Sequence, residues 1–208
     1  MSFTKPAIYN LALSALLLAK EVTDVATDQS NEVRVLNTHY NIAFDTTLQD
    51  LDLDSTSSEV TLELLANLTS STTEIWNYVY KYPVNCVFLR RIKSQELTDT
   101  RETHIAKRTG LYNTQKAIYT NEVTAVAECI QNDIDLAVLN PMAGMAVAYM
   151  LASLSAPLIV GKGAKALRDK LEAQYLFAKS KAEEMDSLEN FGYESDYLRS
   201  EFVRARLE

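Results

Sequence analysis

Glycine and proline are scarce in this sequence, with 5 Gly and 4 Pro among 208 residues. Turns and irregular loops depend on these two residues, so their scarcity favours long regular elements and disfavours a turn-rich β-sandwich. Cysteine is rarer still. Its two copies, Cys86 and Cys129, cannot supply a disulfide framework or a structural zinc site. We expect both thiols to be reduced and half-buried in an intracellular protein.

Basic residues are outnumbered by acidic ones: the sequence has 20 Lys and Arg and 28 Asp and Glu, which gives a net charge of −8. A dedicated duplex-DNA-binding protein needs a basic face to neutralise phosphates, so this class is disfavoured. Long apolar runs are missing, and we expect no transmembrane helix. The apolar stretch Leu11–Ala19 is interrupted by Ser14, and Asp24 and Asp28 stand where a signal peptide would carry small residues. We interpret this stretch as a core helix.

Acidic and basic residues are concentrated in different stretches of the sequence. Ten acidic residues and one base lie between Glu21 and Glu63, whereas eight bases and three acids lie between Lys81 and Lys116. Two interpretations stay open. The charges cover solvated faces, or they form complementary surfaces on copies of this chain or on neighbouring proteins.

Apolar residues recur at helical spacing in five segments. A capping-box pattern, Thr56-x-x-Glu59, opens the third of them, and Pro157 is expected to stop the fourth. The segments predicted as helices are residues 6–22, 33–50, 56–68, 141–157 and 164–188.

β-branched and aromatic residues with partial alternation replace the helical pattern after Ser71. The predicted strands are residues 78–82, 84–92, 103–107, 117–120 and 123–129. The expected fold is therefore mainly α, a helical bundle of four to five helices with a small antiparallel β insertion and an extended C-terminal tail. Residues 1–75 and 136–188 would form the bundle, 76–135 the β-rich insertion and 189–208 the C-terminal extension.

Catalytic patterns are not found. His39 and His104 lie in different predicted elements and lack the i, i+4 spacing of a paired metal site. The glycines of Gly161-Lys162-Gly163 lack the spacing of a phosphate loop, and the acids around residues 50–59 suit a helix start better than a glycosidase pair. We therefore predict a protein that is not an enzyme, with no catalytic residues, no cofactor and no metal site.

Tyrosine dominates the aromatic residues, and three tyrosines alternate on one predicted strand close to two arginines. They could stack on single-stranded nucleic acid, but alternating tyrosines more often form a core wall or a protein contact. The residues that we predict for a subunit or tail interface are Tyr78, Tyr80, Tyr82, Arg90 and Arg91.

Several segments, taken in order, resemble one known family. The family's first helix is similar to Ile8–Leu13, and its second is similar to Asp28–Glu32 together with the apolar positions that follow. Its closing pair of helices is similar to Pro141–Pro157 and Gly161–Ser187. The most specific stretch is Trp76–Ile92. It contains an aromatic run, a proline, the small polar residues Asn85 and Cys86, and then an apolar strand that ends in basic residues. Between residues 6 and 188 the chain resembles the head-to-tail adaptors of tailed bacteriophages, of the tail tubular protein A type found in short-tailed phages. The aromatic phrase that usually ends the family's second helix is replaced here by Leu51-Asp52-Leu53.

The resemblance implies a virion structural protein at the head-tail junction, made in the host bacterial cytoplasm. It implies a homo-oligomeric ring, twelve-fold in symmetry, that binds the portal protein and the downstream tail or nozzle proteins. Genomic DNA would pass through the lumen without sequence-specific binding, and no membrane is involved. The alternatives are a tail-completion or collar protein of a long-tailed phage and a tail-associated peptidoglycan hydrolase.

Aromatic and basic residues alternate in the C-terminal segment after the helical pattern lapses. Bulky anchors separated by charges are typical of a segment that becomes ordered on a partner. The resemblance makes the portal that partner, and the predicted portal-binding residues are Phe191, Tyr193, Tyr197, Arg199, Phe202, Arg204 and Arg206.

Overall fold

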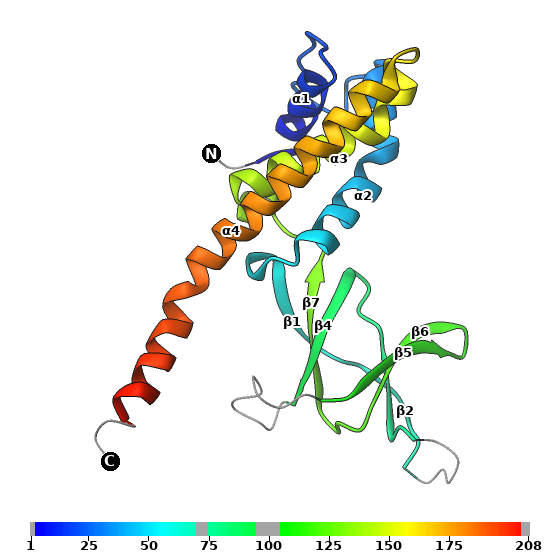
Figure 1. Cartoon of the computed structure of the whole chain (residues 1–208). Coiled ribbons are helices and arrows are strands. Elements are labelled where there is room, and N and C mark those ends of the chain that lie inside the picture. Colours follow the sequence, from blue (N-terminus) through cyan, green and yellow to red (C-terminus); the bar gives the residue numbers. More distant parts are fainter. Residues whose placement is uncertain (1–2, 70–74, 95–104, 205–208) are drawn as a thin grey trace. The chain divides into compact units, whose positions relative to one another are not determined.

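The computed structural model has an α+β fold, and the mainly α prediction is wrong. It describes residues 3–69, 75–94 and 105–204, with side chains up to residue 189. Within these residues it contains four α-helices and two antiparallel sheets with seven strands, with 48% of residues helical and 24% in strands. The chain divides into two compact units (Figure 1): a helical unit, Met1–Ser55 with Ile134–Glu208, and a β unit, Thr56–Asp133.

The helical unit is built from α1 (Lys5–Ala15), α2 (Asn31–Leu51), α3 (Pro141–Ile159) and α4 (Ala164–Arg204). Helix α3 lies at its centre and packs against the other three (Figure 1). Its N-cap Asn140 accepts a hydrogen bond from the Ala143 amide at 2.8 Å, and Pro141 occupies the first turn, where no amide hydrogen is needed. The predicted start of this helix is confirmed. Pro157 lies in its last turn, two residues before the end.

Small residues on α3 allow the other helices to approach closely. Its alanines at 143, 146, 148, 152 and 156 are buried, and so is Gly144. Helix α3 is long and apolar enough to cross a membrane by length and composition alone, with a mean hydropathy of 1.7. However, 56% of this stretch is buried inside the protein, which is the pattern of a core helix.

Helix α1 ends earlier than the sequence predicts, at Ala15 rather than near residue 22. The chain then turns back, and the side-chain amide of Asn10 binds the backbone of the returning segment. Its Nδ2 donates to the Val22 carbonyl at 3.0 Å, and its Oδ1 accepts from the Val22 backbone amide at 2.7 Å. Val22 is buried, so the apolar spacing that suggested a longer helix comes from a returning segment.

Helix α4 continues to Arg204, where an extended tail after Leu188 was predicted. Gly161 and Gly163 take positive φ angles in the turn from α3, which lets α4 run back along it. With 41 residues, α4 has a length of roughly 60 Å at 1.5 Å per residue. Its C-terminal part extends past the other helices of the unit (Figure 1). The predicted change to an extended tail is therefore wrong for the residues up to Arg204.

The β unit contains a sheet in the order β1-β7-β4 and a sheet in the order β2-β3-β6-β5. All neighbouring strands are antiparallel. The strands are β1 (Ser57–Thr61), β2 (Leu64–Asn67), β3 (Tyr78–Lys81), β4 (Cys86–Ser94), β5 (Lys107–Tyr112), β6 (Gln115–Thr120) and β7 (Ala125–Gln131).

The helix predicted for residues 56–68 is wrong, because this segment forms a short 3-10 turn followed by β1 and β2. Strand β1 pairs with β7, with Ser57 opposite Ile130. The Thr56-x-x-Glu59 pattern is local, whereas the pairing partner lies about seventy residues later, and distant pairing overrides local propensity. The β unit therefore begins at Thr56, whereas the sequence analysis began the β-rich insertion at residue 76.

Candidate functional site

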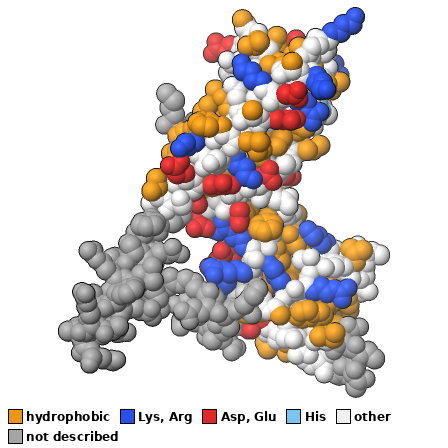
Figure 2. All heavy atoms as spheres, in the orientation of Figure 1, with side chains coloured by type: hydrophobic (Ala, Val, Ile, Leu, Met, Phe, Trp, Pro, Cys, Tyr) orange, Lys and Arg blue, Asp and Glu red, His pale blue; other side chains and the backbone are white. Residues whose placement is uncertain are grey.

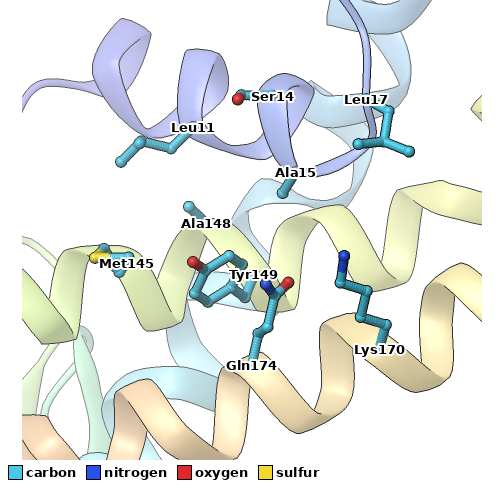
Figure 3. Close-up of a pocket in the computed structure, with 9 residues that line it drawn as sticks. All are labelled: Leu11, Ser14, Ala15, Leu17, Met145, Ala148, Tyr149, Lys170 and Gln174. Atoms are coloured by element: carbon cyan, nitrogen blue, oxygen red, sulfur yellow. The ribbon is translucent and has the colours of Figure 1, made fainter.

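An apolar groove runs over the helical unit between α1, α3 and α4 (Figure 3). It consists of two adjoining pockets of about 210 and 400 Å³. Both pockets share four lining residues: Met145, Tyr149, Lys170 and Gln174. Leu11, Ser14, Ala15 and Leu17 close one end, and Met142, Ala173, Phe177 and Ala178 line the other.

Large apolar side chains in and beside the groove are exposed. Phe177 lines it and is 62% exposed, and Leu176 beside it on α4 is exposed to the same extent. Leu17 at the opposite end is 78% exposed. Hydrophobic side chains also show on the helical unit in Figure 2, among acidic and basic ones. Exposed apolar side chains that gather around a groove mark a surface that binds another protein.

Leu17 is held in this exposed position by a strained backbone. Helix α1 ends in a Schellman motif, in which the Leu18 amide donates to the Leu13 carbonyl and the Leu17 amide to the Ser14 carbonyl. Leu17 occupies the left-handed position of this motif, with φ of 64°, where glycine is usual. A leucine there costs free energy and gains little burial within the chain.

Leu17→Gly is expected to raise the free energy of unfolding of the helical unit by up to about 1 kcal/mol, because glycine adopts the left-handed conformation without strain. The same change removes an apolar side chain from the lining of the groove. Urea unfolding followed by helical circular dichroism measures the change in stability. Loss of stability in Leu17→Gly would show that the leucine side chain already packs within its own chain.

This groove was not predicted from the sequence, although Met142, Met145 and Tyr149 all lie in the helix predicted for residues 141–157. The available signal was on α4, where Leu176 and Phe177 stand outside the apolar stripe that Leu171 and Tyr175 form at helical spacing. Apolar residues on the polar side of an amphipathic helix indicate a second contact surface.

The predicted interface tyrosines lie in the β unit and contribute to its core. Tyr80 is 2% exposed, and its hydroxyl donates to the carbonyls of Glu122 and Val123 at 2.9 and 2.5 Å. Tyr78 and Tyr82 are partly buried against the same apolar cluster. The structure therefore places Tyr80 in a core wall and Tyr78 and Tyr82 at its edge.

The predicted interface arginines pair within the β unit. Arg91 Nε donates to Glu128 at 2.8 Å, and Arg90 lies 3.6 Å from the other oxygen of the same carboxylate. The Lys93 ammonium lies 2.6 Å from the Glu128 carboxylate and also contacts the carboxylate of Glu59. Glu128 is buried, and hydrogen bonds from Lys93 and Arg91 lower its pKa in spite of the desolvation that raises it. These arginines therefore stabilise the sheet β1-β7-β4 around one buried acid.

The remaining candidates from the sequence are dispersed. His39 Nδ1 lies 3.2 Å from the hydroxyl of the buried Ser155, as expected of a structural histidine. His104 and Arg206 lie outside the described residues, and the side chains of the other predicted portal-binding residues lie beyond residue 189. Within the described residues, no group of three His, Cys, Asp or Glu side chains could hold a metal ion.

Comparison with known proteins leaves the chain without an assigned relative. A scan against protein-family models and a search of curated proteins both find no match.

Proposed function

We propose that this chain is a head-to-tail adaptor of a tailed bacteriophage, a virion structural protein that forms a ring on the portal. The observation that carries the proposal is the apolar groove of the helical unit, whose exposed Phe177 and Leu17 need a covering partner. The ordered resemblance of residues 6–188 to that adaptor family supports the same assignment.

The covering partner in this proposal is a neighbouring copy of the chain. A groove filled by a different surface of the next copy makes a head-to-tail contact, and such contacts close into rings when the rotation between copies allows. Lys170 lies among the apolar lining residues and supplies a positive charge at the groove (Figure 3). An acidic side chain of the neighbour would pair with it at the rim of such an interface.

The acidic composition suits a channel for DNA. A net charge of −8 gives phosphate groups few attractive contacts, so a nucleic acid passes such a surface without being held. Some of the basic residues are also paired with acidic residues of the same chain, such as Arg168 with Glu172 on α4, which leaves fewer cations to bind phosphate.

The portal contact is assigned in this proposal to the end of α4. Among the side chains described on α4, up to residue 189, Ala182 is the last buried one, and the helix itself continues to Arg204. The aromatic and basic residues from Phe191 onward would then anchor this helical extension on the portal, with Arg206 just past it.

The proposal is tested by mixing the purified chain with the portal protein of the same virus and imaging the complex by negative-stain electron microscopy. A ring of adaptor copies on the portal is expected. Phe177→Glu is expected to abolish the ring, because it places a charge in the groove, while the melting temperature stays unchanged. Val84→Glu is the matched control, since Val84 is 87% exposed on the β unit and outside the groove.

Truncation after Leu188 separates the portal contact from ring formation. The truncated chain keeps every described core residue of α4 and is expected to melt like the intact chain but to lose docking. A chain that stays monomeric with the portal present, or that clears a peptidoglycan suspension, would overturn the adaptor assignment.

A further inference from the structure

The two cysteines of the chain are neighbours in the β unit. Cys86 begins β4 and Cys129 lies in the adjacent antiparallel strand β7. Cys86 stands opposite Gln131, and this register puts Cys129 two residues along the same face of β7. Both contribute to one apolar cluster, in which Cys129 is buried and Cys86 packs against it.

The two thiols differ in accessibility. Cys129 is fully buried, whereas Cys86 is half-buried. A small solute therefore reaches the sulfur of Cys86 first, and Cys129 is available only to a group that is already inside the cluster.

The surroundings of Cys86 favour its thiolate. Its Sγ lies 3.3 Å from the hydroxyl of Tyr82, and the Lys116 ammonium lies 3.5 Å from the centre of the Tyr82 ring. The hydrogen bond with Cys129 lowers the pKa of Cys86 to about 7, with further support from Tyr82 and from the charges of Lys116 and Lys107. The same hydrogen bond and burial raise the pKa of Cys129. A nucleophilic sulfur thus stands beside a protonated one at neutral pH.

We propose that Cys86 and Cys129 form a reversible oxidation site, at which hydrogen peroxide converts the thiol pair into a disulfide that joins β4 to β7. Cys86 is the attacking residue, because it is the more accessible of the two and its thiol donates to the Tyr82 hydroxyl, which can donate in return once the thiolate forms. Cys129 is the resolving residue, because it is buried in the apolar cluster against which Cys86 packs. This site is independent of the adaptor assignment.

The chemistry balances in two steps. The Cys86 thiolate attacks one oxygen of the peroxide, the O–O bond breaks, and the leaving hydroxide takes a proton to become water, which leaves a sulfenic acid. The Cys129 sulfur then attacks the Cys86 sulfur, the S–O bond breaks, and the hydroxyl group leaves as water with the Cys129 proton. The two sulfurs together lose the two electrons that reduce the peroxide, and a thiol reductant reverses the reaction.

The test treats the reduced full-length chain with hydrogen peroxide, blocks remaining thiols by alkylation and maps the peptides by mass spectrometry. A Cys86–Cys129 cross-link is expected as the main product, together with a higher melting temperature of the β unit that a reductant reverses. Cys129→Ser is expected to stop at a sulfenic acid on Cys86, which dimedone traps. Cys86→Ser is expected to leave Cys129 unoxidised.

Tyr82→Phe provides a second measurement that leaves both thiols in place. Loss of its hydroxyl is expected to raise the pKa of Cys86 above about 7 and so to slow its alkylation at pH 7 by roughly fivefold, because the thiolate fraction falls. Tyr78→Phe is the matched control and should react like the wild type. Oxidation that yields only intermolecular dimers, equal reactivity of the two thiols, or an unchanged rate in Tyr82→Phe would overturn the proposal.

Discussion

Replacing Glu128 with glutamine is expected to lower the free energy of unfolding of the β unit by about 3–5 kcal/mol. The Glu128 side chain is only 11% exposed and is the shared partner of Arg90, Arg91 and Lys93. Removing the central negative charge leaves three cations close together, two of which are also largely buried, and their repulsion in a partly desolvated site is costly.

The fluorescence of Trp76, the single tryptophan of the sequence, reports on the β unit during urea unfolding. Glu63→Gln is the matched control, because Glu63 pairs with Lys81 while its side chain is 70% exposed. An exposed pair is worth about 1 kcal/mol or less. Equal effects in the two variants would show that the Glu128 cluster is no stronger than a surface ion pair.

The same carboxylate predicts a pH dependence. Its pKa is lower in the folded chain than its ordinary value near 4.5, so its stabilising contribution is present above that value and is lost as the pH falls through the folded pKa. The β unit of the wild type should therefore lose stability on acidification below about pH 4.5 more steeply than that of Glu128→Gln. Parallel acid profiles would contradict this account.

Leu171→Ala is expected to lower the free energy of unfolding of the helical unit by about 2–5 kcal/mol. Leu171 is fully buried on α4, which packs along α3, and the close packing of helix interiors leaves a cavity when its side chain is truncated.

Leu176→Ala is the control, since it makes the same chemical change on the same helix at a residue that is 62% exposed. Thermal melting followed by helical circular dichroism compares the two variants. We expect the melting temperature to fall sharply for Leu171→Ala and to stay near the wild-type value for Leu176→Ala. Equal shifts would show that the exposed face of α4 already packs within the single chain.

Helices with strong local signals were predictable from the sequence. The Asn140-Pro141 start of α3 is both a cap and a favourable first turn, and α2 at Asn31–Leu51 follows the predicted apolar stripe of residues 33–50. The helix wrongly predicted for residues 56–68 lies where the local signal is weak and distant pairing decides the conformation. Strand β1 has no strong pattern of its own, and its conformation depends on pairing with β7.

The candidate site was less predictable, because exposure and ion pairing are properties of the folded chain. Arg90 and Arg91 stand in a basic stretch of the sequence, and the acid that they share, Glu128, lies in a different strand. The partner of Cys86 is likewise distant in sequence. Only the register of β4 against β7 brings these residues together.

The position of the β unit within the sequence has a consequence for synthesis on the ribosome. Thr56–Asp133 is one continuous segment, whereas α1 and α2 must wait for α3, the helix against which both mainly pack. The β unit can therefore complete its folding first, while the apolar faces of α1 and α2 remain uncovered in the nascent chain. Because Ser57 pairs with Ile130, its two ends leave the unit side by side. Deleting the whole segment and joining Ser55 to Ile134 through a short linker should accordingly yield a helical unit that folds faster and exposes less apolar surface during translation.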